Sequence, residues 1–233
     1  MKHDMLDTMR NICDDNNTAA RLIASGSLRE AYRLLQDATK TACESLSFLQ
    51  WESSSHGGNE IDDLEKTQED QVLVSTFPVY QPELEETNVF LLPFFIQDPS
   101  MNEHNIRNKL PAICAVLICN MAISCHRFFY VARDCAKRQQ SLLHAQQLYA
   151  ESFELLQHLH LGGCLGQIFL GICNNMVEIA HEDGDLVNVQ YWYGLLSEEL
   201  GSSQTRCYDP ALCRSAFRSV VYYSGVMVSA RAA

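Results

Sequence analysis

The sequence predicts an all-α protein built from helix-turn-helix repeats, with one short β-hairpin or irregular insert. Three observations favour this fold class. Apolar residues recur at the 3–4 spacing of a helix face on both sides of the insert. Of the 233 residues, 47% are hydrophobic, so the chain can bury a sizeable core. It contains only 11 Gly and 6 Pro, which suits long helices better than many short strands.

Residues 1–50 are predicted to form the first helical hairpin, with two helices over 12–48. Apolar residues of the second helix recur on one face, at Leu28, Ala31, Leu35 and Ala38. Gly26 can adopt the left-handed conformation that ends a helix, and Ser27 can cap the helix that follows. The pattern therefore indicates a tight turn between two antiparallel helices.

Residues 51–110 are predicted to be an insert of different character. The part over 51–70 is polar, glycine-bearing and acidic, and we expect a mobile linker there. The runs 71–80 and 87–97 are rich in Val, Phe and Ile and favour a two-stranded arm. A proline in each run restricts the arm to edge-like or irregular pairing.

Residues 111–233 are predicted to be helical again and to join the first hairpin in one helical-repeat domain. The expected helices lie near 112–128, 138–160, 165–182, 186–200 and 210–228. The last begins at Asp209-Pro210, an acid at the N-cap followed by Pro at the first helical position, and could cap the stack. The apolar run Leu110–Cys125 contains Asn120, so we interpret it as a buried core helix and not as a membrane span.

The charge distribution argues against nucleic-acid and membrane partners. The net charge is −12, and residues 151–200 contain no Lys or Arg. A field of this sign repels nucleic-acid phosphates and anionic lipid surfaces. The one basic cluster is Arg127, Arg133, Lys137 and Arg138, which we interpret as a solvated turn between helices.

The cysteines and the N-terminus indicate a reducing intracellular compartment, either cytoplasmic or nuclear. Most of the ten cysteines sit within helical periodicity, and no Cys-x-x-Cys pair occurs, so free thiols are expected. The first residues carry acids where a signal peptide would have a continuous apolar core.

Three segments of the chain share one frame. The first has Gly26 at its turn and runs through Ala38; the second contains Met121-Ala122; the third has Gly184 at its turn and Tyr193 in its second helix. This pattern resembles the tetratricopeptide repeat over residues 12–48 and 112–200. It departs from it by lacking the early Trp and the closing Pro, and by a longer second turn. The resemblance implies a superhelix of stacked hairpins whose concave surface binds a peptide or a partner protein.

One residue type recurs in all three frames, since Asn17, Asn120 and Asn175 each precede the small-residue position of the first helix. In peptide-binding proteins of the resembled family, an Asn at this place hydrogen-bonds the ligand's main chain, because an amide both donates and accepts. The predicted peptide-binding residues are Asn17, Asn120, Ile123, His126, Arg127, Asn174, Asn175, Glu178 and His181.

No catalytic residue, cofactor or metal is predicted, because no phosphate loop, nucleophile elbow or dinucleotide fingerprint occurs. Glu178-x-x-His181 has di-iron ligand spacing but has no second copy, and His158-x-His160 with Cys164 suits a helix end better than zinc. The leading prediction is a protein-interaction scaffold and not an enzyme. Two alternatives stay open: an all-α enzyme with His and Glu residues in a pocket, and a structural subunit whose groove is filled by its own 71–97 arm.

Overall fold

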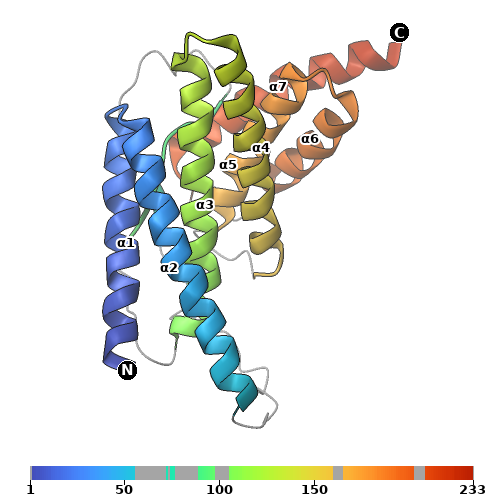
Figure 1. Ribbon diagram of the computed structural model, residues 1–233. Coiled ribbons are helices and arrows are strands. Elements are labelled where there is room, and N and C mark those ends of the chain that lie inside the picture. Colours follow the sequence, from blue (N-terminus) through green and yellow to red (C-terminus); the bar gives the residue numbers. More distant parts are fainter. Residues whose placement is uncertain are drawn as a thin grey trace.

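The protein is an assembly of long helices with one small sheet (Figure 1). The computed structural model describes residues 2–55, 72, 74–76, 89–97, 105–159, 165–201 and 208–232. The elements of this part are α1 (Lys2–Ala24), α2 (Leu28–Ser55), β1 (Val74–Thr76), β2 (Phe94–Ile96), α3 (Ile106–Val131), α4 (Cys135–Gln157), α5 (Leu165–Glu182), α6 (Leu186–Gly201) and α7 (Pro210–Ala232). The prediction of an all-α fold with one short hairpin is confirmed.

Two of the helical hairpins turn in the same way. Gly26, between α1 and α2, has φ 85°, and Gly184, between α5 and α6, has φ 69°. At the first turn the N–H of Ser27 donates to Leu22, and at the second the N–H of Asp185 donates to Ala180. These six-to-one bonds close the Schellman motif, in which a left-handed residue ends a helix. At both turns, the glycine that the sequence places between two apolar-periodic runs thus ends the first helix.

The turn between α3 and α4 is built differently, because it has no glycine. Ala132 ends α3 in an extended conformation, and Asp134 starts α4 as its N-cap. The Asp134 carboxylate accepts from the N–H groups of Ala136 and Lys137, at 2.9 and 3.3 Å. The cap replaces the glycine as the signal that separates the two helices.

Helix α3 is the centre of the packing. It contacts α2 and α4 most extensively and also touches α1, α5 and β2. Within the described residues, α3 is the one helix that is long and apolar enough to cross a membrane, and 83% of its apolar stretch is buried inside the protein. This burial agrees with the interpretation of Leu110–Cys125 as a core helix.

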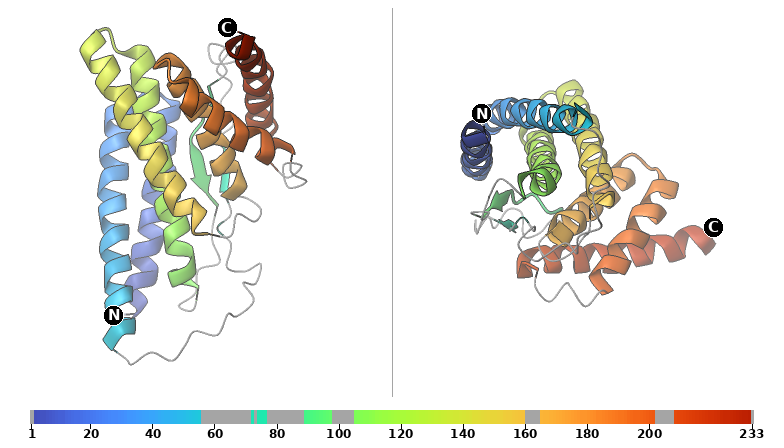
Figure 2. Two further views of the ribbon diagram at one scale, coloured as in Figure 1. Left: turned by 90° about the vertical axis from the view of Figure 1, so that its right-hand side faces the viewer. Right: turned by 90° about the horizontal axis from the view of Figure 1, so that it is seen from below.

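The small sheet lies against the first helices of the hairpins. Strands β1 and β2 pair antiparallel with Ser75 opposite Phe95. In the view from below, both strands lie beside α1 and α3, on the side away from α2 (Figure 2, right). The sheet therefore covers the helical face that the sequence analysis predicted to bind a peptide.

Some boundaries differ from the sequence expectation. Helix α3 starts at Ile106, before the expected residue 112, and includes Pro111 in its early turns. Each strand has only three residues. Helix α2 continues to Ser55, into the stretch expected to be linker, and the rest of the acidic segment, residues 56–71, lies outside the described residues.

The cysteines that the structure describes are free thiols, and half of these eight residues are buried. Burial raises the pKa of Cys114 and of Cys125 to about 12, so both thiols stay protonated at neutral pH. Such groups act as small apolar side chains in the core. Cys164 and Cys207 lie outside the described part of the chain.

Candidate functional site

The candidate site is the face of α1, α3 and α5 on which the segment 89–97 lies. We call residues 89–97 the resident segment. Phe90, Phe94 and Ile96 are 3%, 0% and 2% exposed. An extended segment buried to this degree needs partners for its main-chain N–H and C=O groups, because an unpaired buried polar group is costly.

Three asparagines supply these partners, one from each first helix. Asn17 accepts from the N–H of Ile96 at 2.9 Å and donates to its C=O at 2.8 Å. Asn120 makes the same two bonds to Phe94, at 2.8 and 2.7 Å. Asn175 repeats them on Phe90, also at 2.8 and 2.7 Å. We call Asn17, Asn120 and Asn175 the asparagine ladder.

The ladder takes the place of a neighbouring strand. In an extended chain the N–H and C=O of one residue point to the same edge, and the next residue points to the other edge. Phe90, Phe94 and Ile96 are separated by even numbers of residues, so their main-chain groups face the ladder together. Phe95 lies opposite Ser75 of β1, on the other edge. The strand β2 is therefore held between β1 and the ladder.

Asn16 hydrogen-bonds to Asn120 of the ladder and was not among the residues predicted from the sequence. It is 0% exposed. It donates to the C=O of Phe94 at 3.1 Å, and its Oδ1 accepts from Asn120 at 2.9 Å. A signal for it exists, because Asn16-Asn17 repeats in α5 as Asn174-Asn175.

Asn175 extends the network into the core. Its Nδ2 also donates to Tyr149 Oη at 2.8 Å, and Tyr149 Oη lies 3.5 Å from His126 Nδ1. Burial lowers the pKa of His126 to about 3, so its ring is neutral at physiological pH. We assign the ring proton to Nε2, since Nδ1 then accepts from the tyrosine hydroxyl. A neutral chain of polar groups thus supports the ladder from behind.

The other predicted site residues lie elsewhere. Ile123 is fully buried in the core. Arg127 is half-buried, and burial lowers the pKa of its guanidinium. His126 packs between aromatic rings, with Tyr130 stacked at 5.6 Å. None of these three contacts the resident segment through a hydrogen bond in the described part of the chain.

A second group of predicted residues faces α7. Asn174 accepts from Ser219 at 2.8 Å, and Glu178 accepts from the hydroxyl of Tyr223. The ring of His181 lies 5.3 Å from that of Tyr223. The structure brings the three ladder asparagines onto one segment, whereas Asn174, Glu178 and His181 join α5 to the last helix.

The described residues contain no group of three or more His, Cys, Asp or Glu side chains placed to hold a metal ion. Glu178 and His181 are instead engaged by the tyrosines of α7. His158 is exposed at the end of α4, while His160 and Cys164 lie outside the described residues.

Comparison with protein-family models, with curated proteins and with solved structures gives no match to this chain.

Proposed function

We propose that this protein is an interaction scaffold whose inner helical face recognises an extended peptide, and that its own resident segment is the first ligand of that face. The observation that carries the proposal is the asparagine ladder. Three amides on three helices each bind both polar main-chain groups of one residue. This arrangement recognises an extended main chain whatever its side chains are.

Side-chain selectivity comes from the space between the amides. A Cβ added at Gly171 of α5 would lie 3.2 Å from the ring of Phe94 and 3.5 Å from that of Phe90. The absence of a side chain there gives the two rings room, and their centroids lie 5.8 Å apart. A competing peptide should therefore carry aromatic residues four apart, followed by an aliphatic residue two positions later.

A partner peptide would bind by exchange with the resident segment. The resident segment is covalently attached, so a free peptide competes with an intramolecular ligand of high effective concentration. A free peptide competes only when the resident segment is weakened or locally released. Binding in trans should thus be weak to the native chain and strong to variants with a loosened segment.

The test uses a fluorescent peptide of residues 87–98 with added terminal lysines, followed by fluorescence anisotropy. Ile96→Ala and Phe94→Leu each loosen the resident segment without adding a polar group. We expect both variants to bind the peptide at least about tenfold more tightly than the native chain does. A tenfold difference in affinity corresponds to about 1.4 kcal/mol of binding free energy. Adding Asn120→Ala should abolish most of that gain. The matched control is Asn108→Ala, an exposed asparagine of the same helix.

A second function is supported by the near-complete burial of Phe90, Phe94 and Ile96. In this candidate the protein is a structural subunit whose inner face is filled permanently by its own segment. The same titration separates the two. Folded Ile96→Ala and Phe94→Leu variants that bind no peptide would reject the scaffold proposal and favour the self-filled subunit.

A further inference from the structure

A pocket of about 660 Å³ lies between α2, α3 and α4. Its lining comes from the C-terminal turns of α3 and from the N-terminal turns of α2 and α4. Its volume falls in the range of sites that take small organic ligands, about 300–1,000 Å³. The resident segment does not line it.

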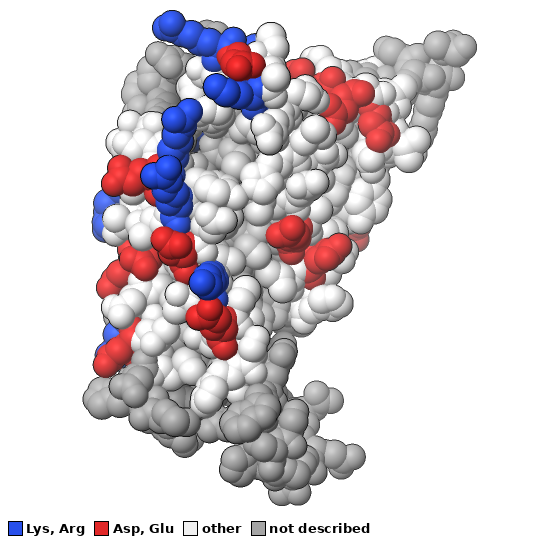
Figure 3. Space-filling model, in the orientation of Figure 1, with Lys and Arg blue, Asp and Glu red and all other residues white. Residues whose placement is uncertain are grey.

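The pocket is basic in a strongly acidic protein. Arg29, Arg33 and Lys137 line it, and no Asp or Glu does so among the residues that the structure describes. Figure 3 shows Lys and Arg side chains gathered over the upper part of this face, with Asp and Glu more frequent below and to the right. The whole chain carries a net charge of −12, so the charge of the pocket is opposite in sign to that of the protein as a whole.

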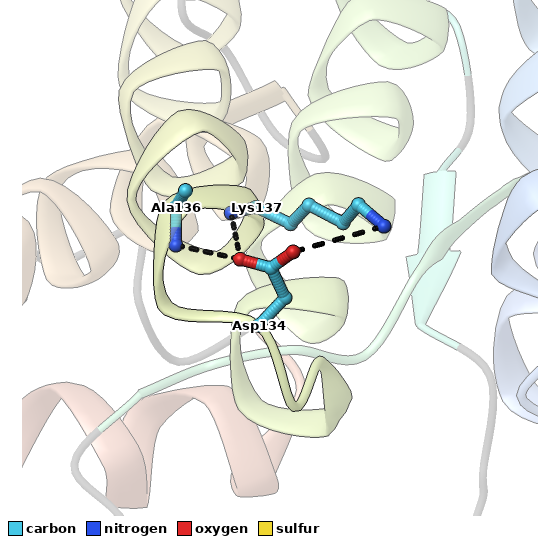
Figure 4. Close-up of polar contacts among 3 residues, drawn as sticks. All are labelled: Asp134, Ala136 and Lys137. Carbon is cyan, nitrogen blue, oxygen red and sulfur yellow. Dashed lines mark hydrogen bonds and ion pairs between the residues drawn. The ribbon is translucent and has the colours of Figure 1, made fainter.

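The three cations are not consumed by ion pairs within the pocket. Arg29 lies over the ring of Phe128 at 5.6 Å, and Arg33 has no ion pair with any residue of the described part. Lys137 approaches Asp134 at 3.8 Å, with both side chains more than half exposed (Figure 4). An exposed pair at this distance is weak. Asp134 is further occupied by the N–H groups that it caps at the start of α4.

Polar and apolar groups complete the lining. The N-terminal turns of α2 and α4 and the C-terminal turns of α3 all reach the pocket, so the helix dipoles contribute both signs and the three cationic side chains set its charge. Tyr32 Oη and His144 Nε2, which lie 2.7 Å apart, supply polar groups to its lining. The apolar part of the lining includes Phe128, on which a ring could pack.

Two titratable groups of the lining, Cys125 and Tyr32, are protonated. Burial raises the pKa of the Cys125 thiol to about 12, and burial also raises the pKa of the Tyr32 hydroxyl. Both groups stay protonated at neutral pH, and a thiol is nucleophilic only as the thiolate.

We propose that this pocket binds a phosphate monoester carried on an aromatic ring, with the phosphate on Arg29, Arg33 and Lys137 and the ring against Phe128. Arginine suits this task because its planar fork donates two hydrogen bonds to one phosphate. Free aromatic phosphates and the phosphotyrosine side chain of a partner peptide share this chemistry. The site is separate from the asparagine ladder, and it does not depend on the function proposed there.

The test titrates the intact chain with phenyl phosphate by calorimetry, with phenol and inorganic phosphate as the two partial ligands. Phenyl phosphate should bind saturably and at least about tenfold more tightly than either partial ligand. Raising the salt concentration should weaken it. If phenol bound as tightly as phenyl phosphate, the role of the cations would be overturned. If inorganic phosphate bound as tightly as phenyl phosphate, the role of the ring would be overturned.

Variants place the site. Arg33 is exposed, so the Arg33→Gln variant should fold normally and should bind phenyl phosphate at least about tenfold more weakly. The charge-preserving Arg33→Lys variant should lose less of this affinity. Lys40→Gln removes one exposed charge from the same helix outside the pocket and should change nothing. Equal effects of Arg33→Gln and Lys40→Gln would overturn the proposal.

One more titration identifies the source of the ligand. A phosphotyrosine peptide that binds much more tightly than phenyl phosphate, and that loses this affinity in Arg33→Gln, assigns the pocket to a partner protein. Equal affinities, both lost in Arg33→Gln, assign it to a free small molecule. Failure of both ligands to bind the folded native chain contradicts the pocket proposal and leaves the ladder proposal unaffected.

Discussion

Asn120 on α3 binds both main-chain polar groups of Phe94, with its Oδ1 2.8 Å from the nitrogen and its Nδ2 2.7 Å from the carbonyl oxygen. Both residues are 0% exposed. The carbonyl has a second donor in Asn16, whereas the N–H group donates to Asn120. The two bonds of this amide thus help to keep the resident segment buried.

The first prediction follows from this pair. Asn120→Ala should lower the free energy of unfolding by about 1–3 kcal/mol, because a buried main-chain N–H loses its acceptor. Denaturant unfolding measures the change. Asn108→Ala, exposed on the same helix, should stay within about 0.5 kcal/mol of the native chain. Equal stability of the two variants would show that the amide of Asn120 contributes nothing to the segment's binding.

The second prediction concerns pH and His126. Burial lowers its folded pKa from 6.5 to about 3, so between these values the unfolded chain binds the extra proton. Stability therefore rises with pH across this window and is lost as the pH falls. At about pH 4.5 the loss from this residue should be roughly 2–3 kcal/mol.

The control for this prediction is His126→Gln, which keeps an acceptor near Tyr149 but does not titrate. Other groups contribute to the pH dependence of both proteins, so the difference between their profiles isolates His126. The native chain should lose stability more steeply than the variant below about pH 6.5. Parallel profiles would contradict a buried, neutral His126.

The third prediction compares two helical glycines. A Cβ on Gly166 of α5 would overlap Tyr208 Oη, and that hydroxyl donates to Glu199 at 2.5 Å. Gly166→Ala should displace the buried tyrosine and cost about 1–3 kcal/mol. Gly194→Ala meets nothing within 4 Å and should stabilise α6 by about 0.5–1 kcal/mol. Thermal unfolding should show shifts of opposite sign, and shifts in one direction would disprove the contact with Tyr208.

Local signals make much of the fold predictable. Gly26 and Gly184 each stand between two runs of helical periodicity, and both adopt the left-handed conformation that a turn requires. Asn17, Asn120 and Asn175 hold one place in a repeating frame, and all three bind the same extended segment. Periodicity determines which residues share a face because the helical period is regular.

The remaining features depend on long-range packing. Glu178 and His181 face α7, and no local pattern says where that last helix lies. His126 is buried because Tyr130 and Tyr149 surround its ring. The register of the resident segment depends on three-residue strands, which are too short for alternation to reveal.

Residue-resolved hydrogen exchange tests most directly whether the asparagine ladder binds the resident segment. The amide protons of Phe90, Phe94 and Ile96 should be protected about a thousandfold or more in the native chain, like those of the core helices. Asn120→Ala should reduce the protection of Phe94 at least about tenfold, while α3 stays protected. Exchange of these three amides at the rate of an unstructured peptide, with the core helices still protected, would contradict the ladder.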